Sequence, residues 1–442
     1  MYLHGTSRVN EQGHLEIGEC DTVDLAAEFG TPLYVFDESL IRNTSREFRA
    51  SLDVSGLKYQ VTYASKAFCT VAMCALAAEE QLGLDVVSGG ELYTAHRANF
   101  PMDRVHFHGN NKTTEEIAQA LDLNIGSFVV DNFYELELLG RMATERGKTV
   151  HILLRITPGV EAHTHEYIST GQQDSKFGFD LAAGQAHQAV EAALQTSGVQ
   201  LIGIHSHIGS QIFETQGFQI AIGRLAELYE WCVKSANAKL SVLNVGGGFG
   251  IRYSEEHNPP AIGVVIEAIT STIKAEFGAR SISEPEVWIE PGRSIVGPAG
   301  TTLYTVGSTK EVEGIRKYVA VDGGMTDNPR PALYQAKYEA MLANRCLEPA
   351  DDLVSIAGKC CESGDMLIWD VHLPRPVAGD ILAVSCTGAY NYAMASNYNR
   401  IARPAVVFVA DGKAEIAVKR ESLDDLVSND LLPERMRVAE RV

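Results

Sequence analysis

The stretch Tyr59-Gln60-Val61-Thr62-Tyr63-Ala64-Ser65-Lys66-Ala67 joins a short apolar run to a lysine. The run Tyr59–Tyr63 has the composition of a β-strand, which places Lys66 at the carboxyl end of that strand. Burial among apolar neighbours disfavours the ammonium form, so an amine there can act as a nucleophile near neutral pH. A lysine that keeps its charged end in water is the simpler interpretation of this segment alone, and the rest of the sequence decides between the two.

Apolar runs like the first one recur from about residue 58 to residue 293. The eight runs are Tyr59–Tyr63, Leu84–Val87, Val105–His108, Phe128–Val130, His151–Ile156, Leu201–His207, Leu240–Val245 and Val287–Glu290. Stretches between them, such as Glu115–Leu123, Glu135–Glu145 and Phe218–Ala236, carry apolar residues at helical spacing. Eight β/α repeats over roughly 235 residues match a (β/α)₈ TIM-like barrel, which typically takes about 250. Near-continuous apolar strands also suit a parallel sheet covered by helices.

Reactive residues fall where such a barrel keeps its active site, at the carboxyl ends of the strands. Those ends carry Lys66, Ser88-Gly89-Gly90, His108, Asp131-Asn132, Arg155, His207, Gly246-Gly247-Gly248 and Glu290-Pro291-Gly292-Arg293. This pattern favours one catalytic centre at the mouth of the barrel and a chemical role for Lys66.

After about residue 300 the sequence predicts a second, mainly β domain. Its expected strands are Thr302–Val306, Lys317–Asp322, Asp352–Ala357, Ile381–Ser385, Ala405–Val409 and Ala414–Lys419. The N-terminal runs Leu15–Ile17 and Leu33–Phe36 join this domain or lead into the barrel. We therefore predict an α/β protein with a barrel at residues 38–298 and a β-rich domain built from residues 1–37 and 299–442.

Composition indicates a globular protein that binds neither nucleic acid nor membranes. Of 442 residues, 45% are hydrophobic and 21% are charged, as in folded soluble proteins. The net charge of −20 disfavours nonspecific binding to nucleic acid or anionic membranes, and no apolar run is long enough to span a bilayer. The eight cysteines lack CxxC spacing, and the N-terminus lacks a signal-peptide core. We therefore expect a cytoplasmic enzyme with reduced cysteines.

Three further motifs of the barrel carry groups that could bind a cofactor beside Lys66. The glycines Gly246–Gly248 let backbone N–H groups cradle a phosphate, although a glycine run alone can be a tight turn. Glu290 can face a pyridine nitrogen and keep it protonated, or pair with Arg293 at the surface. Strand alternation puts His205 and His207 on one face, so one of them can pack against a cofactor ring while Ser210 donates to the phosphate. A nucleophilic lysine among these groups suits a Schiff base with an aldehyde cofactor.

Three further motifs lie beyond the barrel. Arg330 offers a planar fork for a carboxylate, with Tyr334 close by in sequence. Cys361 can donate a proton, and Glu362 can hold a substrate ammonium group. Tyr390 adds a phenol in a glycine-containing loop. Each motif alone also fits a structural role, as a solvated arginine, a buried cysteine or a packed tyrosine. These motifs reach the barrel mouth only if the β domain, from the same chain or a partner subunit, folds over it.

A metal site is the competing interpretation from a different class of enzyme. HxH pairs occur at His106/His108, His163/His165 and His205/His207, and barrel metallohydrolases combine such pairs with a lysine and an aspartate. The glycine run and the Glu290–Arg293 pair have no role in that chemistry. The sequence therefore favours a site without a metal.

Taken together, these segments resemble the pyridoxal-phosphate decarboxylases built on an alanine-racemase-type barrel with a β domain, and they are most similar to the diaminopimelate decarboxylase family. The segments are 63–66, 205–211, 244–250, 290–296, 328–334, 361–365 and 387–390, and the likeness extends from His4-Gly5-Thr6 to at least Lys419. Lys359 differs from the small residue or proline expected before the Cys360-Cys361 pair, but it carries no assigned role.

The resemblance implies pyridoxal 5′-phosphate as cofactor and decarboxylation of meso-2,6-diaminopimelate to L-lysine and CO₂, the last step of lysine biosynthesis by that route. It implies Lys66 and Cys361 as catalytic residues. The implied cofactor-binding residues are Lys66, His207, Ser210, Gly246, Gly247, Gly248, Glu290, Gly292, Arg293 and Tyr390. The implied substrate-binding residues are Arg293, Arg330, Tyr334, Glu362 and Tyr390. Cys361 and Glu362 come from the second subunit in this family, so the resemblance implies a homodimer with shared sites, in which the β domain serves substrate binding and dimerisation.

Two further alternatives remain open at the level of sequence. A decarboxylase of ornithine, lysine or arginine belongs to the same class, but those substrates lack the distal carboxylate that Arg330 would bind. A catalytically silent relative that acts as a binding partner would have no need of Lys66, Glu290 and Cys361.

Overall fold

The computed structural model describes residues 1–160 and 175–437, and the chain forms two compact units. Unit 1 consists of Met1–Thr6, Asp37–Gly300 and Ser385–Ala393, and unit 2 consists of Ser7–Phe36, Thr301–Val384 and Met394–Val442. The predicted division at residues 38–298 differs from these units chiefly in two short segments, 1–6 and 385–393. Cys386 of the second segment contacts both His4 of the first segment and the carbonyl oxygen of Arg252 in a barrel loop, and both segments group with the barrel.

Unit 1 contains a closed barrel of parallel strands. In chain order the strands are β5 (Tyr59–Ala64), β6 (Gly83–Val86), β7 (Val105–Phe107), β8 (Ser127–Val130), β9 (Val150–Thr157), β11 (Val199–His205), β12 (Val242–Asn244) and β13 (Glu286–Ile289). Each strand pairs with its neighbour in this order, and the pairing of β13 with β5 closes the barrel. All eight predicted runs are confirmed as strands. A two-residue strand, β10 (Phe179–Asp180), pairs with β9 and was not predicted.

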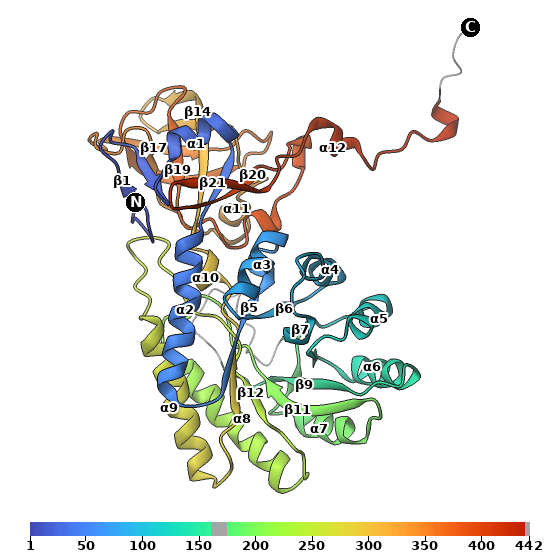
Figure 1. Ribbon diagram of the computed structural model, residues 1–442. Helices are drawn as coiled ribbons and strands as arrows, with labels where there is room; N and C mark the ends of the chain where they lie inside the picture. The colour runs from blue at the N-terminus through green and yellow to red at the C-terminus, as the bar shows by residue number, and fades with distance from the viewer. Residues whose placement is uncertain (161–174, 438–442) are drawn as a thin grey trace. The chain divides into compact units, whose positions relative to one another are not determined.

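Helices lie outside the strands of the barrel (Figure 1). They are α2 (Glu38–Ser55), α3 (Val71–Glu79), α4 (Gly89–Arg97), α5 (Thr114–Leu123), α6 (Phe133–Glu145), α7 (Gln185–Gln195), α8 (Gln216–Lys234), α9 (Ile262–Ala279) and the short α10 (Arg293–Val296). Ser88 and Asn132, two of the polar residues at predicted strand ends, accept hydrogen bonds from the first turns of α4 and α6. These two side chains therefore cap helices, as serine and asparagine commonly do.

Large apolar side chains pack together among the barrel strands. Val129, Leu153, Val242 and Trp288 form a buried cluster, against which Ile202 packs. These residues come from five different strands, so the cluster ties the two sides of the barrel together. Full burial of such a side chain contributes roughly 1.5–3 kcal/mol.

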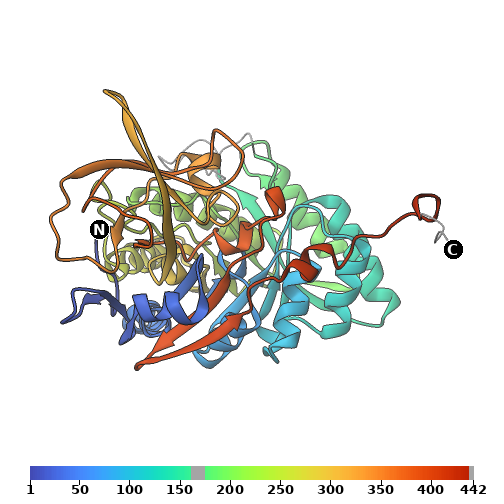
Figure 2. The ribbon, with the colours of Figure 1, turned by 90° about the horizontal axis from the view of Figure 1, so that it is seen from above.

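Unit 2 is mainly β-structure. Its strands are β1 (Arg8–Val9), β2 (Leu15–Ile17), β3 (Cys20–Asp21), β4 (Leu33–Asp37), β14 (Gly300–Val312), β15 (Arg316–Val321), β16 (Ala340–Leu342), β17 (Asp352–Ala357), β18 (Met366–Leu373), β19 (Ile381–Val384), β20 (Ala405–Ala410) and β21 (Lys413–Val418). Its helices are α1 (Thr22–Phe29), α11 (Arg330–Tyr334) and α12 (Leu423–Val427). Strands β14 and β15 form a long antiparallel hairpin (Figure 2).

The N-terminal runs belong to unit 2. Strand β4 lies between β14 and β20 in the sheet order β18-β17-β15-β14-β4-β20-β21, whereas β2 pairs with β1 and β3 in a small separate sheet. All six strands predicted after residue 300 are present, whereas β16 and β18 were not predicted. None of the helices within residues 1–160 and 175–437 combines the length and the apolar character that crossing a bilayer requires.

Candidate active site

Lys66 lies directly after β5, on a single turn of 3₁₀ helix at Ser65–Ala67. Ser65 and Ala67 are buried, whereas Lys66 is exposed. The expectation that apolar neighbours bury this lysine is therefore wrong. The turn explains the difference, because the hydroxyl of Ser65 donates to the carbonyl oxygen of Asp85 and thereby fixes the flanking residue, not the lysine, in the interior. The positive charge of Lys66 acts on two carboxyl groups, Asp85 and Glu91, and lowers the pKa that burial raises in each.

Glu290, directly after β13, is buried and contacts donors on both carboxylate oxygens. Its Oε1 accepts a hydrogen bond from Nδ2 of Asn244 at 2.6 Å and lies 3.3 Å from Nε2 of His108. Its Oε2 lies 3.2 Å from Nε2 of His205. Burial raises the pKa of Glu290, but His205 and His108 outweigh burial and hold that pKa well below its usual value. Glu290 is therefore a buried carboxylate that keeps its charge.

A second buried carboxyl group, Asp85 on β6, extends this network. Its Oδ1 lies 3.1 Å from the same Nε2 of His108 that faces Glu290. Burial, and then the negative charge of Glu290, raise the pKa of Asp85 well above its usual value. Burial also lowers the pKa of His108 well below its usual value. Asp85 was not predicted as a site residue, although a charged residue inside the apolar run Leu84–Val87 is a usable signal.

The glycine run after β12 packs directly on the loop after β11. Gly246 and Gly248 have φ values of +73° and +101°, and a Cβ atom on either would lie 2.4 Å from a backbone oxygen, of Ser206 or of Gly209. Only glycine fits this combination of backbone conformation and close approach. The N–H of Gly247 donates to Nδ1 of His207 at 3.2 Å, which fixes the imidazole beside the glycines.

His205 and His207 do not follow the strand alternation used to place them. Strand β11 ends at His205, so His207 lies in the loop, where alternation no longer applies. His205 contacts Glu290, whereas His207 contacts the glycine run. Burial and then the charge of Lys66 hold the pKa of His207 well below its usual value, so its ring is neutral.

Arg293 connects the eighth strand end to these loops. Its guanidinium donates to the hydroxyls of Tyr253, at 2.5 Å, and of Ser210, at 2.8 Å. Its Nε is buried and has no hydrogen-bond partner among residues 1–160 and 175–437. The alternative that Arg293 pairs with Glu290 at the surface is not what the structure has, because both side chains are buried and Arg293 contacts hydroxyls. Tyr253 was missed by the sequence analysis, since nothing in the sequence near Arg293 points to it.

Tyr390 belongs to unit 1 although it follows β19 in the chain. Its backbone N–H donates to the carbonyl oxygen of Ala67 at 2.8 Å, one residue after Lys66. The guanidinium carbon of Arg293 lies 4.8 Å from the centre of the Tyr390 ring. Tyr390 has a φ of +62°, an unusual value for a bulky residue that occurs most often at functional sites. The structure therefore brings Tyr390 to the loops that carry Lys66 and Arg293.

The residues predicted beyond the barrel lie in unit 2. Arg330 begins α11, is buried, and donates to the hydroxyl of Tyr338 at 2.6 Å. Tyr334 ends the same short helix and is half-buried. Tyr338, which orients the arginine, was not identified from the sequence.

The Cys360-Cys361 pair divides into a buried and an exposed thiol. Cys360 is buried, whereas Cys361 and Glu362 are exposed. The carboxylate of Asp365 accepts hydrogen bonds from the N–H groups of Cys360 and Met325, which holds the turn in place. The interpretation of Cys361 as a buried structural cysteine is therefore wrong, and Cys360 takes that place.

Within the described residues, the two histidines of an HxH pair contact different partners and are not arranged to bind one metal ion together. His106 contacts Gln60 and Ser127, at 2.8 and 2.7 Å, away from the partners of His108. His163 and His165 lie outside the described residues. His108, His205 and Glu290 bring possible ligand atoms within 4.8 Å of one another, but each of these atoms already contacts another member of the network.

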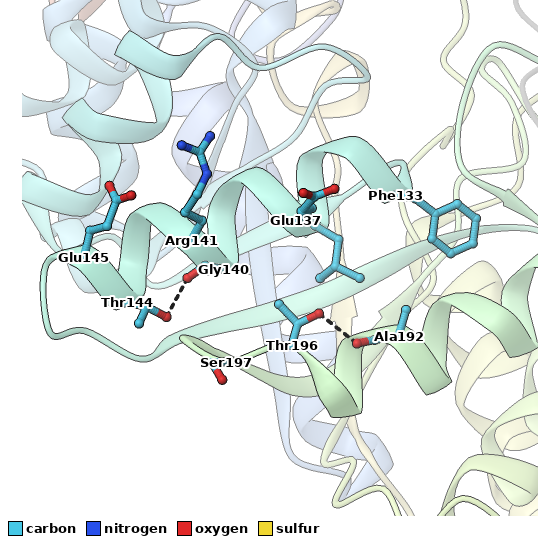
Figure 3. Close-up of a pocket in the computed structure, with 10 residues that line it drawn as sticks. Phe133, Glu137, Gly140, Arg141, Thr144, Glu145, Ala192, Thr196 and Ser197 are labelled. Carbon is cyan, nitrogen blue, oxygen red and sulfur yellow. Dashed lines mark hydrogen bonds between the residues drawn. The ribbon is translucent and has the colours of Figure 1, made fainter.

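A separate hollow of about 370 Å³ lies between α6 and α7 (Figure 3). It contains none of the predicted site residues. The hydroxyls of Thr144 and Thr196 in its lining donate to carbonyl oxygens of their own helices, those of Gly140 and Ala192. These two hydroxyls are satisfied without a ligand.

Comparison with known proteins places the chain in a family. Residues 38–297 match the family model "Pyridoxal-dependent decarboxylase, pyridoxal binding domain". The chain is 60% identical to the diaminopimelate decarboxylase of Bacillus subtilis (strain 168), over 98% of both chains, and 50% identical to that of Staphylococcus aureus (strain COL), over 96% of this chain and 99% of the relative. The chain belongs to the diaminopimelate decarboxylase family. A solved diaminopimelate decarboxylase from M. jannaschii, in co-complex with L-lysine, has a TM-score of 0.92 at 35% identity and covers 98% of this chain and 99% of its own.

As a member of the diaminopimelate decarboxylase family, the chain is a pyridoxal-phosphate-dependent decarboxylase, and the predicted barrel of alanine-racemase type with a mainly β domain is confirmed. The residues at the barrel mouth fit this cofactor. The glycine run leaves no room for side chains, and in the described part of the chain Arg293 Nε, Ser206 Oγ and Ser294 Oγ are buried polar atoms without hydrogen-bond partners. A bound anionic group would satisfy such atoms. An anionic carboxylate, Glu290, suits the ring nitrogen of the same cofactor.

Proposed function

We propose that the chain removes CO₂ from meso-2,6-diaminopimelate and releases L-lysine, as the last step of lysine biosynthesis by the diaminopimelate route. The supporting observation is the meeting of Lys66 and Glu290 at two adjacent strand ends. The N–H of Ala64 donates to the carbonyl oxygen of Pro291 at 3.1 Å, which ties the Lys66 turn to the Glu290–Arg293 segment. The nearly full-length match to diaminopimelate decarboxylases directs this site to that substrate.

Pyridoxal 5′-phosphate, when bound, supplies an electron-poor ring that accepts the electron pair left behind when the carboxylate departs as CO₂. Lys66 would hold its aldehyde end, Glu290 its pyridine nitrogen, and the neutral ring of His207 its face. The residues that would hold the phosphate and the remaining edge are Ser210, Gly246, Gly247, Gly248, Gly292, Arg293 and Tyr390.

Glu290 contributes a fixed negative charge. Its carboxylate stays ionised because His205, His108 and Asn244 surround it, and the same contacts prevent it from turning away. A fixed charge in a buried site stabilises an opposite charge more strongly than a solvated one does, because little reorganisation is needed during the reaction. Glu290 would therefore keep a proton on the ring nitrogen of the bound cofactor.

Substrate recognition rests on charged groups that match both ends of diaminopimelate. Arg330, buried and oriented by Tyr338, is suited to the distal carboxylate because a planar guanidinium binds carboxylates with two parallel hydrogen bonds. Glu362 would bind the distal ammonium group, with Tyr334 beside it. Arg293 and Tyr390 would contact the end of the substrate that reacts. Ornithine, lysine and arginine lack the distal carboxylate that the guanidinium of Arg330 is suited to bind.

Cys361 is the proposed donor of the proton that replaces the carboxylate at Cα. We infer that the active form is a cytoplasmic homodimer, in which Cys361 and Glu362 of one subunit serve the site of the other. The exposure of both side chains supports this arrangement, since a residue that acts in another subunit has to be on the surface of its own. In this scheme residues 38–298 bind the cofactor together with Tyr390, and the rest of residues 1–37 and 299–442 supplies substrate binding and dimerisation.

Measurement of CO₂ release tests the proposal. Purified protein with pyridoxal 5′-phosphate is supplied separately with meso-diaminopimelate and with L-lysine, and we expect CO₂ only from the first. The Lys66→Ala variant should lose the visible absorbance of the bound cofactor together with CO₂ release. Release from L-lysine at an equal rate would reject the substrate assignment, and an unchanged spectrum in Lys66→Ala would reject the role of that residue.

A further inference from the structure

The three side chains that hold Glu290 approach it from two sides of the barrel. His205 and Asn244 stand at the ends of β11 and β12, on one side of β13. His108 follows β7, which is separated from β13 by β5 and β6 on the other side. His108 is therefore the contact that holds Glu290 from across the barrel mouth, at 3.3 Å between Nε2 and Oε1.

His108 is itself held by Asp85. The same ring nitrogen, Nε2, lies 3.1 Å from Oδ1 of Asp85 and 3.3 Å from Oε1 of Glu290. One neutral imidazole nitrogen cannot satisfy two ionised carboxylates, and two buried carboxylates this close cannot both be charged without a large cost. One of the two therefore carries a proton.

The surroundings decide which carboxyl group carries that proton. Glu290 receives a hydrogen bond from Asn244 and has His205 on its second oxygen. Among the described residues, His108 is the one side chain within hydrogen-bond distance of the Asp85 carboxyl group. The pKa directions agree, since burial and Glu290 raise the pKa of Asp85 while the two histidines lower that of Glu290. The neutral group is Asp85, and the charge is on Glu290.

We propose that His108, anchored by a neutral Asp85, is a positioning residue that fixes the Glu290 carboxylate and keeps the negative charge on it. This inference rests on the proposed function, in which Glu290 faces the pyridine nitrogen of the cofactor. Loss of His108 leaves Glu290 held from one side only and removes the group that separates the two carboxyl groups. Glu290 can then shift or share its charge with Asp85, and the ring nitrogen is less firmly protonated.

The test uses the cofactor-loaded protein and two buried histidines of the same strand segment. His108→Leu removes the contact with Glu290, and His108→Gln returns a side-chain amide near the position of Nε2. His106→Leu is the matched control, because His106 is equally buried but contacts Gln60 and Ser127. We measure kcat and KM for diaminopimelate, the affinity for the cofactor, and the absorbance spectrum of the bound cofactor between pH 6 and 9.

His108→Leu should lower kcat by roughly 100-fold, the size of effect seen when a reacting group is misplaced by about 1 Å. Its KM should change little, and the pH dependence of its cofactor spectrum should shift. His108→Gln should recover most of kcat, and His106→Leu should keep the spectrum and kcat of the unmodified protein. Equal losses in His108→Leu and His106→Leu, or an unchanged spectrum in His108→Leu, would overturn the proposal.

Asp85 gives a second measurement that does not depend on the His108 variants folding. Asp85→Asn keeps a neutral hydrogen-bonding group, whereas Asp85→Leu removes it. A neutral Asp85 predicts that Asp85→Asn retains at least about tenfold more kcat than Asp85→Leu, and equal losses would overturn the assignment of the proton. Failure of the proposed function gives a different result from failure of this inference: the unmodified protein itself would release no CO₂ from diaminopimelate.

Discussion

Replacement of Lys112 by methionine should destabilise unit 1 strongly, although Lys112 is not part of the proposed site. Its ammonium group donates to Glu135 at 2.7 Å and to the carbonyl oxygens of Gly109 and Val129, each at 2.9 Å. The side chains of Lys112 and Glu135 are only 1% and 3% exposed. The second oxygen of Glu135 accepts a hydrogen bond from the N–H of Asp131. This buried pair therefore ties the loop after β7 to the end of β8 and the start of α6.

The magnitude follows from what the substitution leaves behind. Lys112→Met buries an uncompensated carboxylate, and breaking a buried ion pair in this way costs about 3–5 kcal/mol. Glu135→Gln should cost less, because its one amide oxygen still accepts from either Asp131 or Lys112, and Lys112 keeps its hydrogen bonds to the carbonyl oxygens of Gly109 and Val129. The double variant Lys112→Met with Glu135→Gln should be more stable than Lys112→Met alone, since no buried charge remains. Lys234→Met is the control, because its pair with Glu230 is exposed and contributes at most about 0.5 kcal/mol.

The assay is urea unfolding at pH 5 and pH 8. Burial raises the pKa of Glu135 and Lys112 lowers it, so loss of the lysine lets the folded carboxyl group keep a proton to higher pH. An unfolded glutamate ionises near pH 4.3, and the penalty of Lys112→Met therefore grows as the pH rises from 5 to 8. A loss below about 1 kcal/mol at pH 8, or a double variant less stable than Lys112→Met, would refute the reasoning.

Three further predictions address the glycine run, the substrate and unit 2. Gly246→Ala should weaken cofactor binding by at least about tenfold in a fluorescence titration. Gly56 is the control, because it also has a positive φ but open space where a Cβ atom would lie. Gly56→Ala should leave cofactor binding unchanged and lower the stability by about 1 kcal/mol. Arg330→Ala should raise KM for diaminopimelate by roughly 30-fold and leave cofactor affinity unchanged, since a charge-assisted hydrogen bond is worth about 2 kcal/mol; equal loss of both would contradict the assignment. Burial raises the pKa of Asp327 to about 7. The stability that its neutral form contributes is therefore lost as the pH rises from about 4 to 7. Between pH 5 and pH 8, the free energy of unfolding of Asp327→Asn should rise by on the order of 3 kcal/mol relative to that of the unmodified protein. If the melting temperatures of Asp327→Asn and of the unmodified protein differ by the same amount at pH 5 and at pH 8, this role of Asp327 is excluded.

The barrel could be predicted because each of its strands is an apolar run followed by a helix. Strand β18 was missed for a physical reason. Only its first residues and its last are buried, and its pairing with β17 contains register shifts beside Asp370, which has a φ of +53°. A bulged strand loses the two-residue alternation on which strand prediction depends. Strand β10, with two residues, is too short to produce any pattern.

The candidate site was predictable as far as it follows from strand ends. Lys66, Glu290 and the glycine run are placed by where β5, β13 and β12 stop. The contacts between side chains were not predictable in the same way, because they depend on how the closed barrel turns neighbouring strands toward one another. Asp85 and Tyr253 are examples, since each meets a partner far away in the sequence.

The barrel mouth also depends on a segment that the β/α repeat pattern does not predict. After about 85 residues that belong to unit 2, the segment Ser385–Ala393 returns to unit 1. The N–H groups of Thr387, Gly388 and Tyr390 donate to Gly300, Gly297 and Ala67, and a Cβ atom on Gly388 would lie only 1.8 Å from a carbonyl oxygen.

Such close packing means that this segment is built into the barrel and is not a loose appendage of it. The positive φ values of Cys386 and Tyr390, +59° and +62°, are unfavourable for these residues, and the surrounding contacts have to hold them. Cys386 makes two such contacts, at 3.2 Å to Nε2 of His4 and at 3.2 Å to the carbonyl oxygen of Arg252. The range matched by the family model, residues 38–297, therefore lacks both the segment that carries Tyr390 and the N-terminal histidine that supports it. A barrel cut at those limits would keep Lys66 and Glu290 but lose one of the aromatic rings beside Arg293, so the barrel mouth is built in part from segments outside that range.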